Sequence, residues 1–180
     1  MHTILAGVTL CLLVLLPRVQ AAEMDARLRV AINLFPAFLS AAATDSASAG
    51  NREVVLVYAD MTPRVRAAVD HLRHRLGAKL PNRTLTVSSL GEWDRRSDLQ
   101  GVAAVFLGQK LDHADFRRVL ERAGKAGIPT YSPVPGDVSR GALGGISITD
   151  RILPKINMRT LRGYGFRFKS FYLDVADRHE

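Results

Sequence analysis

Two histidines of this chain have a spacing that could support metal chemistry. His71 and His74 are three residues apart in a stretch expected to be helical, so their side chains would occupy neighbouring positions on one face. Such a pair can bind a transition metal when a third or fourth ligand is close. The apolar stripe of the same helix faces away from both histidines, and the nearby Asp70 projects in another direction. The pattern therefore predicts a solvated surface and no metal site.

Nucleophile and phosphate-binding patterns are incomplete. Ser139 in "GDVSRG" lacks the G-x-S-x-G spacing and follows a loop, which is typical of a turn residue. Lys110 in "LGQKL" has neither the earlier glycine nor the following Ser or Thr of a phosphate loop. "GALGG" precedes an expected strand, whereas the dinucleotide fingerprint precedes a helix. The carboxylates of "GEWDRRSD" lie beside arginines, as in surface ion pairs. We therefore expect no enzyme and no cofactor.

The elements around these residues alternate as in an α/β protein. Continuous apolar runs at 53–59 and 101–108 predict strands covered on both faces, and 83–90 alternates as a half-exposed strand does. Amphipathic stretches follow both buried runs, with Thr62 and Asp112 as N-caps. Buried strands that alternate with such helices predict a three-layer α/β sandwich, a mainly parallel sheet with helices on both faces.

The ends of several elements are also predicted. Residues 26–43 have helical periodicity, and Pro36 should kink or divide that helix because it lacks an amide donor. Gly77 should end the first central helix, and Gly127 the second. The last two strands, "ALGGISITD" and "RILPKIN", are too close for a crossover helix, so we expect them to form an antiparallel C-terminal edge of the sheet.

Residues 1–21 resemble a secretory signal. An uninterrupted apolar run at 4–16 is followed by Pro17, and Val19 and Ala21 fit the small-residue positions of a cleavage site. The run is short for a membrane anchor, although an uncleaved signal anchor stays open because the positive start is weak. We expect cleavage after Ala21, export to the periplasm, and one domain over 22–180. Membrane contact would then come only through an uncleaved signal.

Charge and cysteine content limit the partners. The formal net charge is +8, and loss of the signal lowers it to +7 and removes the single cysteine, Cys11. The mature domain must therefore be stable without disulfides. Most cations have acids nearby, as in "DHADFRRVLER", which is typical of a solvated surface. Together with export, this argues against a nucleic-acid partner.

The chain closes with "INMRTLRGYGFRFKSFYLDVAD", residues 156–177, hereafter the C-terminal segment. We expect Asn157 to cap a short helix that Gly163 or Gly165 ends, and Asn157→Ala to destabilise the fold by about 1 kcal/mol. From Phe168 on, the apolar residues recur at helical spacing, at 168, 171, 172 and 175, which predicts that these residues dock a last element on the domain. The cations of the segment should then face solvent: Arg159, Arg162, Arg167 and Lys169.

This C-terminal pattern resembles the YfiR-like (HmsC-like) family of bacterial periplasmic proteins. The resemblance covers roughly residues 53–177, and "IPTYSPVPGDVSRGALGGISI" and "YADMTPRVRAAVDHL" are similar too. The positions that carry it, taken as structural, are Gly144, Gly145, Ile156, Asn157, Gly165, Phe168, Ser170, Leu173 and Ala176. Two features depart from the family: the mature chain cannot form disulfides, and "LFPAFLSAAATD" replaces the aromatic, Trp-Pro ending of the first helix.

The resemblance implies an exported, non-enzymatic repressor that binds the sensor region of a membrane diguanylate cyclase and lowers cyclic-di-GMP signalling and biofilm formation. Two other functions stay open. A small-ligand carrier could resemble one lobe of a solute-binding protein, with a pocket at the carboxyl edge of the sheet. An exported hydrolase is disfavoured by the incomplete motifs. A homodimer is compatible with each of these functions.

Overall fold

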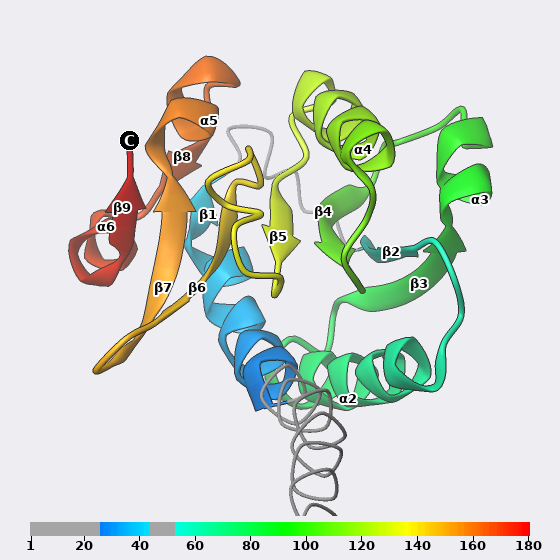
Figure 1. Ribbon diagram of the computed structural model, residues 1–180, viewed down its shortest axis with the longest axis horizontal. Helices are drawn as coiled ribbons and strands as arrows, with labels where there is room; N and C mark the ends of the chain where they lie inside the picture. Colours follow the sequence, from blue (N-terminus) through cyan, green and yellow to red (C-terminus); the bar gives the residue numbers. More distant parts are fainter. Residues whose placement is uncertain (1–25, 44–52) are drawn as a thin grey trace, which may run out of the picture.

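A mainly parallel sheet forms the centre of the protein (Figure 1). The computed structural model describes residues 26–43 and 53–180, so the expected signal peptide and the connector at 44–51 lie outside the described residues. The strand order is β3-β2-β4-β5-β6-β7-β9, and neighbours are parallel except β6 and β7. The strands are β2 (Glu53–Tyr58), β3 (Thr84–Ser89), β4 (Val102–Leu107), β5 (Thr130–Ser132), β6 (Gly144–Ile148), β7 (Ile152–Asn157) and β9 (Asp177–His179).

Helices cover both faces of this sheet, which confirms the predicted α/β fold class. One face carries the N-terminal helix at 26–41, α2 (Pro63–Lys79) and α6 (Ser170–Val175), and the other carries α3 (Leu90–Arg95) and α4 (His113–Lys125). A sixth helix, α5 (Met158–Gly163), follows β7. Two short strands, β1 (Ala42–Ala43) and β8 (Arg167–Phe168), pair outside the main sheet.

The antiparallel hairpin is present, but it does not form the outermost edge. β6 and β7 pair as predicted, and β9 then pairs parallel to β7 on its outer side. β9 has the sequence DRH and carries no apolar alternation that could have indicated a strand. The preceding helix, α6, leads the chain to the outer edge of β7, where β9 pairs with it.

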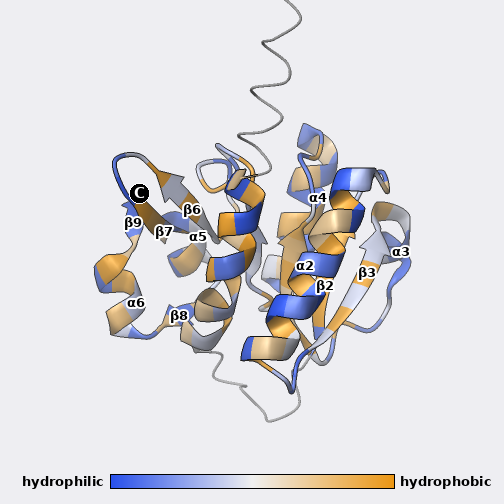
Figure 2. Ribbon diagram, turned by 90° about the horizontal axis from the view of Figure 1, so that it is seen from below, coloured by the Kyte–Doolittle hydropathy of each residue, from blue (hydrophilic) through white to orange (hydrophobic). Residues whose placement is uncertain are grey.

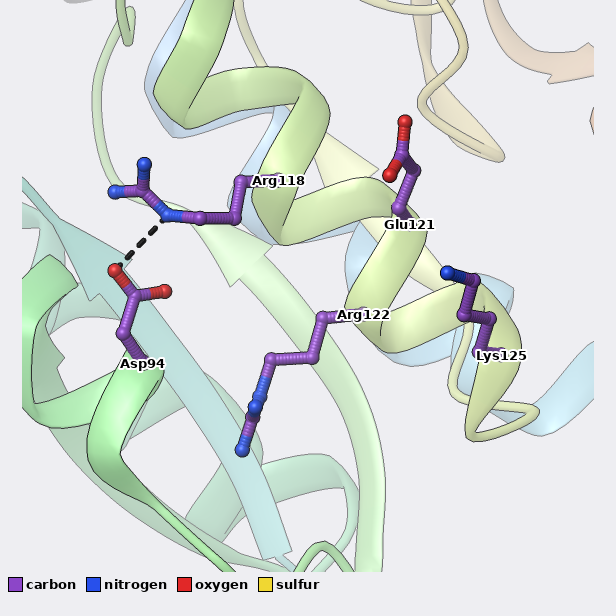
Figure 3. A pocket seen from close by; sticks show the side chains of 5 residues that line it. All are labelled: Asp94, Arg118, Glu121, Arg122 and Lys125. Carbon is purple, nitrogen blue, oxygen red and sulfur yellow. Dashed lines mark ion pairs between the residues drawn. The ribbon is translucent and has the colours of Figure 1, made fainter.

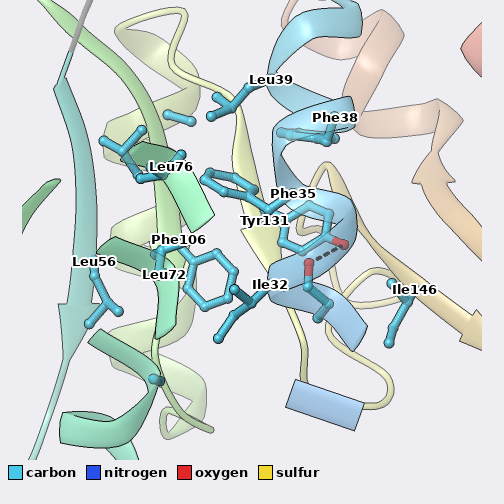
Figure 4. Close-up of a cluster of buried hydrophobic side chains, with 14 of the residues drawn as sticks. Ile32, Phe35, Phe38, Leu39, Leu56, Leu72, Leu76, Phe106, Tyr131 and Ile146 are labelled. Atoms are coloured by element: carbon cyan, nitrogen blue, oxygen red, sulfur yellow. Dashed lines mark hydrogen bonds between the residues drawn. The ribbon is translucent and has the colours of Figure 1, made fainter. Parts of the chain in front are cut away.

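The larger core cluster lies between the sheet and the N-terminal helix (Figure 4). Aromatic rings fill its centre: the centroid of Phe35 lies 5.2 Å from that of Phe106 and 5.2 Å from that of Tyr131. The Tyr131 hydroxyl donates a hydrogen bond to the carbonyl of Ala31, with 3.3 Å between the oxygens. The polar end of this buried ring is thereby satisfied by the helix that covers it.

The predicted caps are confirmed. The Thr62 hydroxyl accepts a hydrogen bond from the Val65 amide at 3.2 Å, and the Asp112 carboxylate accepts one from the Asp115 amide at 2.8 Å. The predicted stripe of α4 is buried too: Phe116, Val119, Leu120 and Ala123. A reciprocal capping box between Ser89 and Glu92 begins α3.

Neither Pro36 nor Gly77 ends its helix. The N-terminal helix is not divided at Pro36 but continues from 26 to 41, and Phe35 and Phe38, both fully buried, pack it against the sheet. Gly77 does not end α2, which continues to Lys79. The helix stops just before Pro81, whose ring disfavours the helical conformation in the residue before it.

One ion pair ties the start of β2 to the residue after α3. Arg96 donates two hydrogen bonds to the carboxylate of Glu53, at 2.9 and 2.5 Å, and the Glu53 side chain is 20% exposed. These bonds lower the pKa of Glu53, although burial opposes the shift. A lowered folded-state pKa stabilises the fold above the unfolded pKa, and this contribution is lost as the pH falls through the folded value.

We expect Glu53→Gln to lower the free energy of unfolding by about 1 kcal/mol at pH 7, because solvent still screens part of the pair. Urea unfolding should show this difference shrink once the pH falls below the ordinary carboxyl range. Glu121→Gln is the matched control, since its pair with Arg117 at 3.5 Å is exposed. A Glu53→Gln deficit that is equally large at acidic pH would contradict this assignment.

Candidate protein-binding surface

The C-terminal segment closes the larger core, as predicted. Phe168 lies 5.2 Å from Phe38 of the N-terminal helix and 5.6 Å from Tyr172, centroid to centroid. The Lys169 amide donates a hydrogen bond to the carbonyl of Ala41 at 2.9 Å. The C-terminal end of the N-terminal helix and the C-terminal segment are therefore packed together. The four cations of the segment are exposed, also as expected: Arg159, Arg162, Arg167 and Lys169.

The positions that carry the family resemblance lie in β6, at the end of β7 and along the C-terminal segment. Gly144 pairs with Ile156, and a Cβ on Gly144 would overlap the ring of Phe38. A Cβ on Gly145 would come within 2.6 Å of the Ser132 carbonyl oxygen, so neither strand position has room for a side chain. The remaining positions follow along the segment: Asn157 ends β7, Gly165 has φ +70 after α5, Phe168 lies in β8, Ser170 and Leu173 in α6, and Ala176 directly after α6.

Helix α6 exposes two large apolar side chains, which corrects one expectation. Tyr172 is buried as predicted, but Phe171 is 60% exposed and Val175 is 56% exposed. Residues 171 and 172 lie about 100° apart on a helix, so both cannot face the core of so short an element. Residues 171 and 175 are one turn apart and share a face, so the two exposed side chains form an apolar stripe on the surface of α6. Figure 2 shows α6 at the edge of the protein, with hydrophobic residues along its ribbon.

A second apolar pair lies at the end of the β6–β7 hairpin. Ile148 and Ile152 are directly opposite each other in the antiparallel pair, and they are 42% and 51% exposed. Directly opposed residues of two strands point to the same face. α6 contacts β7, the strand that begins at Ile152. We call these four side chains, Phe171, Val175, Ile148 and Ile152, the apolar surface.

Polar contacts hold the elements that carry the apolar surface in place. The ammonium of Lys155 lies 3.4 Å from the carboxylate of Asp177, which joins β7 to β9. A hydrogen bond from the Ser147 side chain and the nearby Lys155 lower the pKa of Asp177. The Arg178 Nε donates a hydrogen bond to the carbonyl of Leu173 at 2.9 Å, so this carbonyl in the last turn of α6 has a partner. The apolar side chains thus stand on anchored elements.

The residues considered for chemistry remain dispersed. His71 and His74 are exposed on α2, and no group of three or more candidate metal ligands occurs among residues 26–43 and 53–180. Ser139 is exposed in the loop between β5 and β6. Glu92 serves the cap of α3, and Asp94 pairs with Arg118 at 2.9 Å.

A charged depression of about 670 Å³ lies between α3 and α4 (Figure 3). Three cations and two acids line it: Arg118, Arg122, Lys125, Asp94 and Glu121. The guanidinium of Arg122 lies 5.7 Å from the centroid of the buried Trp93 ring. The acids largely balance the cations, and the lining contains no nucleophile beside a base, so the depression lacks the groups of a hydrolytic site.

The two tyrosines whose pKa values are raised, Tyr131 and Tyr172, belong to the core. Burial raises the pKa of both Tyr131 and Tyr172 above the ordinary phenol value. Both hydroxyls therefore stay protonated at physiological pH, and both rings pack against Phe38. Their shifts are explained by packing and identify no acid–base pair.

Comparisons with known proteins identify the fold. No family of protein sequences matches this chain, and no curated protein matches it. The fold is similar to that of an ABC domain from Streptococcus pneumonia, solved in complex with L-Trp, with a TM-score of 0.56 and 11% sequence identity. The similarity covers 84% of this chain but 61% of that chain. A likeness at this identity concerns the architecture alone.

Proposed function

We propose that this chain is an exported, non-enzymatic regulatory protein that binds the periplasmic sensor region of a membrane signalling protein. The YfiR-like resemblance motivates the partner class, a diguanylate cyclase, and residues 1–21 motivate the periplasmic location. No helix among the described residues is long and apolar enough to cross a bilayer. Binding would therefore use the folded domain.

One observation carries the proposal: the apolar surface exposes four large side chains on anchored elements. An isolated exposed apolar residue is ordinary, but exposed apolar residues that share a face, as Phe171 does with Val175 and Ile148 with Ile152, are typical of protein-interaction sites. A charged pair lies next to Val175, as at many interface edges, since the guanidinium of Arg178 is 3.4 Å from the carboxylate of Asp174 in α6. Phe171 is the natural anchor, since large aromatic side chains contribute disproportionately to binding energy.

Co-purification from solubilised membranes tests this function. The wild-type chain should retain a membrane protein that mass spectrometry identifies as a diguanylate cyclase. The variant Phe171→Asp with Val175→Asp should lose at least roughly 90% of that protein, because two buried, unpaired carboxylates would cost well over 1.4 kcal/mol at the interface. Both side chains are exposed, so the stability of the free chain should hardly change.

The matched control adds two acids elsewhere. Ser97→Asp with Gln100→Asp changes exposed residues of the loop after α3 and should retain the partner fully. Equal retention by the α6 variant and the control would reject the apolar surface as the binding site. The absence of any membrane cyclase from the wild-type sample would reject the proposed partner class.

A small-ligand carrier remains the second candidate, because the similar ABC domain was solved with L-Trp bound. The strand order reverses between β2 and β4, which places a topological switch point at their carboxyl ends. A thermal-shift screen of metabolites separates the two functions, since a ligand that binds only the folded state raises the unfolding midpoint.

A further inference from the structure

The two edges of the main sheet are built differently. β9, the last strand of the order, has the sequence DRH and pairs with residues 155–157 of β7, next to Pro154. Short length, charge and proline are features by which natural sheets keep an edge from pairing with another chain. β3, the first strand of the order, has six residues, TLTVSS, without charge or proline. The β3 edge therefore lacks all three protections.

The backbone of β3 presents free hydrogen-bonding groups along this edge. The amide of Ser89, at the end of the strand, donates to the carboxylate of Glu92 at 2.7 Å and is not used in the pairing with β2. Backbone groups of alternate residues point to the same side of a strand, so those of Leu85 and Val87 also point away from β2. In the described part of the chain, β2 is the only strand that pairs with β3. Two amides and two carbonyls therefore lie at the edge without a neighbouring strand.

The side chains of β3 leave the edge accessible. Thr84 and Thr86 are exposed on one face of the strand. Leu85 and Val87 lie on the other face and are half-buried against the larger core cluster. A strand added at this edge would pair the outward backbone groups and cover the remaining exposed part of both aliphatic side chains.

We propose that two copies of this chain pair antiparallel through β3, about a two-fold axis at Thr86. This register places Leu85 of each copy opposite Val87 of the other as hydrogen-bonded pairs, and Thr86 opposite its own copy as a non-hydrogen-bonded pair. Thr–Thr pairs are favourable across strands. An axis at Val87 would need the Ser89 amide, which Glu92 already occupies. The two seven-stranded sheets would thereby become one continuous sheet.

The uncharged edge favours a second copy as the occupant. The formal net charge of the chain is +8, so two copies repel wherever their cations face each other. β3 presents only threonine, leucine, valine and serine, and its proposed register is complementary to itself, as a two-fold interface requires. β3 and α6 lie at opposite ends of the protein (Figure 1), so the apolar surface of each copy stays accessible. The pairing is independent of the regulatory function above.

Cysteine cross-linking of the full chain locates the axis, with Cys11→Ser in every variant because Cys11 is the single native cysteine. Thr86→Cys should give a disulfide-linked dimer on mild oxidation, since opposed residues of a non-hydrogen-bonded pair have Cα atoms about 4.5 Å apart. Thr84→Cys is the matched control: it is exposed on the same face, but its two copies would lie about 14 Å apart. Equal cross-linking at both positions, or none at position 86, would overturn the proposal.

Sedimentation equilibrium of the full chain tests the pairing without cysteines. The wild type should be dimeric, and Thr86→Lys should raise the dissociation constant at least roughly tenfold, because like charges would be directly opposed on the axis. Thr86 is exposed, so the variant should stay folded, which circular dichroism checks. Thr149→Lys adds the same charge at an exposed position of the β6–β7 hairpin and should leave the dimer unchanged. A monomeric wild type, or an equally large effect of Thr149→Lys, would overturn the proposal.

Discussion

Replacing Phe38 with alanine should lower the free energy of unfolding by about 4 kcal/mol, in the usual range for removal of a fully buried aromatic side chain. Phe38 is 0% exposed. Its ring lies 5.0 Å from Tyr131 of the sheet, 5.2 Å from Phe168 and 6.4 Å from Tyr172, centroid to centroid. One side chain therefore joins the N-terminal helix, the sheet and the C-terminal segment.

The cavity left by Phe38→Ala cannot collapse easily. The Phe38 ring packs directly against Gly144, and this glycine has no side chain that could move into the space. The loss should also be uneven: hydrogen exchange should accelerate more at residues 166–176 than in α4, which packs against the other core cluster.

Urea unfolding measures the effect, with Phe171→Ala as the control. Phe171 is 60% exposed on the same C-terminal segment, so its removal should change stability by no more than about 0.5 kcal/mol. A Phe38→Ala loss as small as that of the control would mean that the C-terminal segment does not pack against the N-terminal helix.

The second large effect is expected at Asn157. Its side-chain oxygen accepts a hydrogen bond from the Thr160 amide at 2.8 Å, which confirms the predicted cap of α5. Its side-chain nitrogen donates to the Val138 carbonyl at 2.6 Å, and the residue is only 4% exposed. Asn157→Ala should therefore cost about 2 to 3 kcal/mol, because a buried carbonyl loses its partner in addition to the lost cap.

Asn157→Asp separates these two contributions. Aspartate caps a helix as well as asparagine does, so a residue that served only as a cap would tolerate the change. Here the second carboxylate oxygen would face the Val138 carbonyl in a buried place, and we expect a loss of at least about 2 kcal/mol. Unfolding curves indistinguishable from wild type for Asn157→Asp would show that the cap alone matters and that the sequence-based value of about 1 kcal/mol is correct.

The contact between Asn157 and Val138 shows what a linear sequence hides. The cap was predictable because its donor lies three residues away, within one turn of helix. The second contact spans 19 residues and depends on how the loop between β5 and β6 folds back over β7. The same holds for β9, whose pairing with β7 depends on the path of α6.

The packing of the C-terminal segment was predicted from the sequence, but the candidate surface was not. The sequence indicated that the C-terminal segment packs on the domain, and it does. It assigned Phe171 and Val175 to the packed side, whereas both are exposed. The adjacency of Phe171 and Tyr172 was a usable signal, since consecutive helical residues face different directions.

Local patterns were sufficient for the α/β class, the alternation of strands and helices, and the caps at Thr62, Asp112 and Asn157, because hydrophobic periodicity and capping act over one or two turns. Tertiary packing alone decided that Pro36 stays helical, that β9 completes the sheet and that α6 turns Phe171 outward. These outcomes depend on contacts between segments that lie far apart in the chain. The packing of buried aromatic rings in these contacts outweighs the secondary-structure propensity of a single residue.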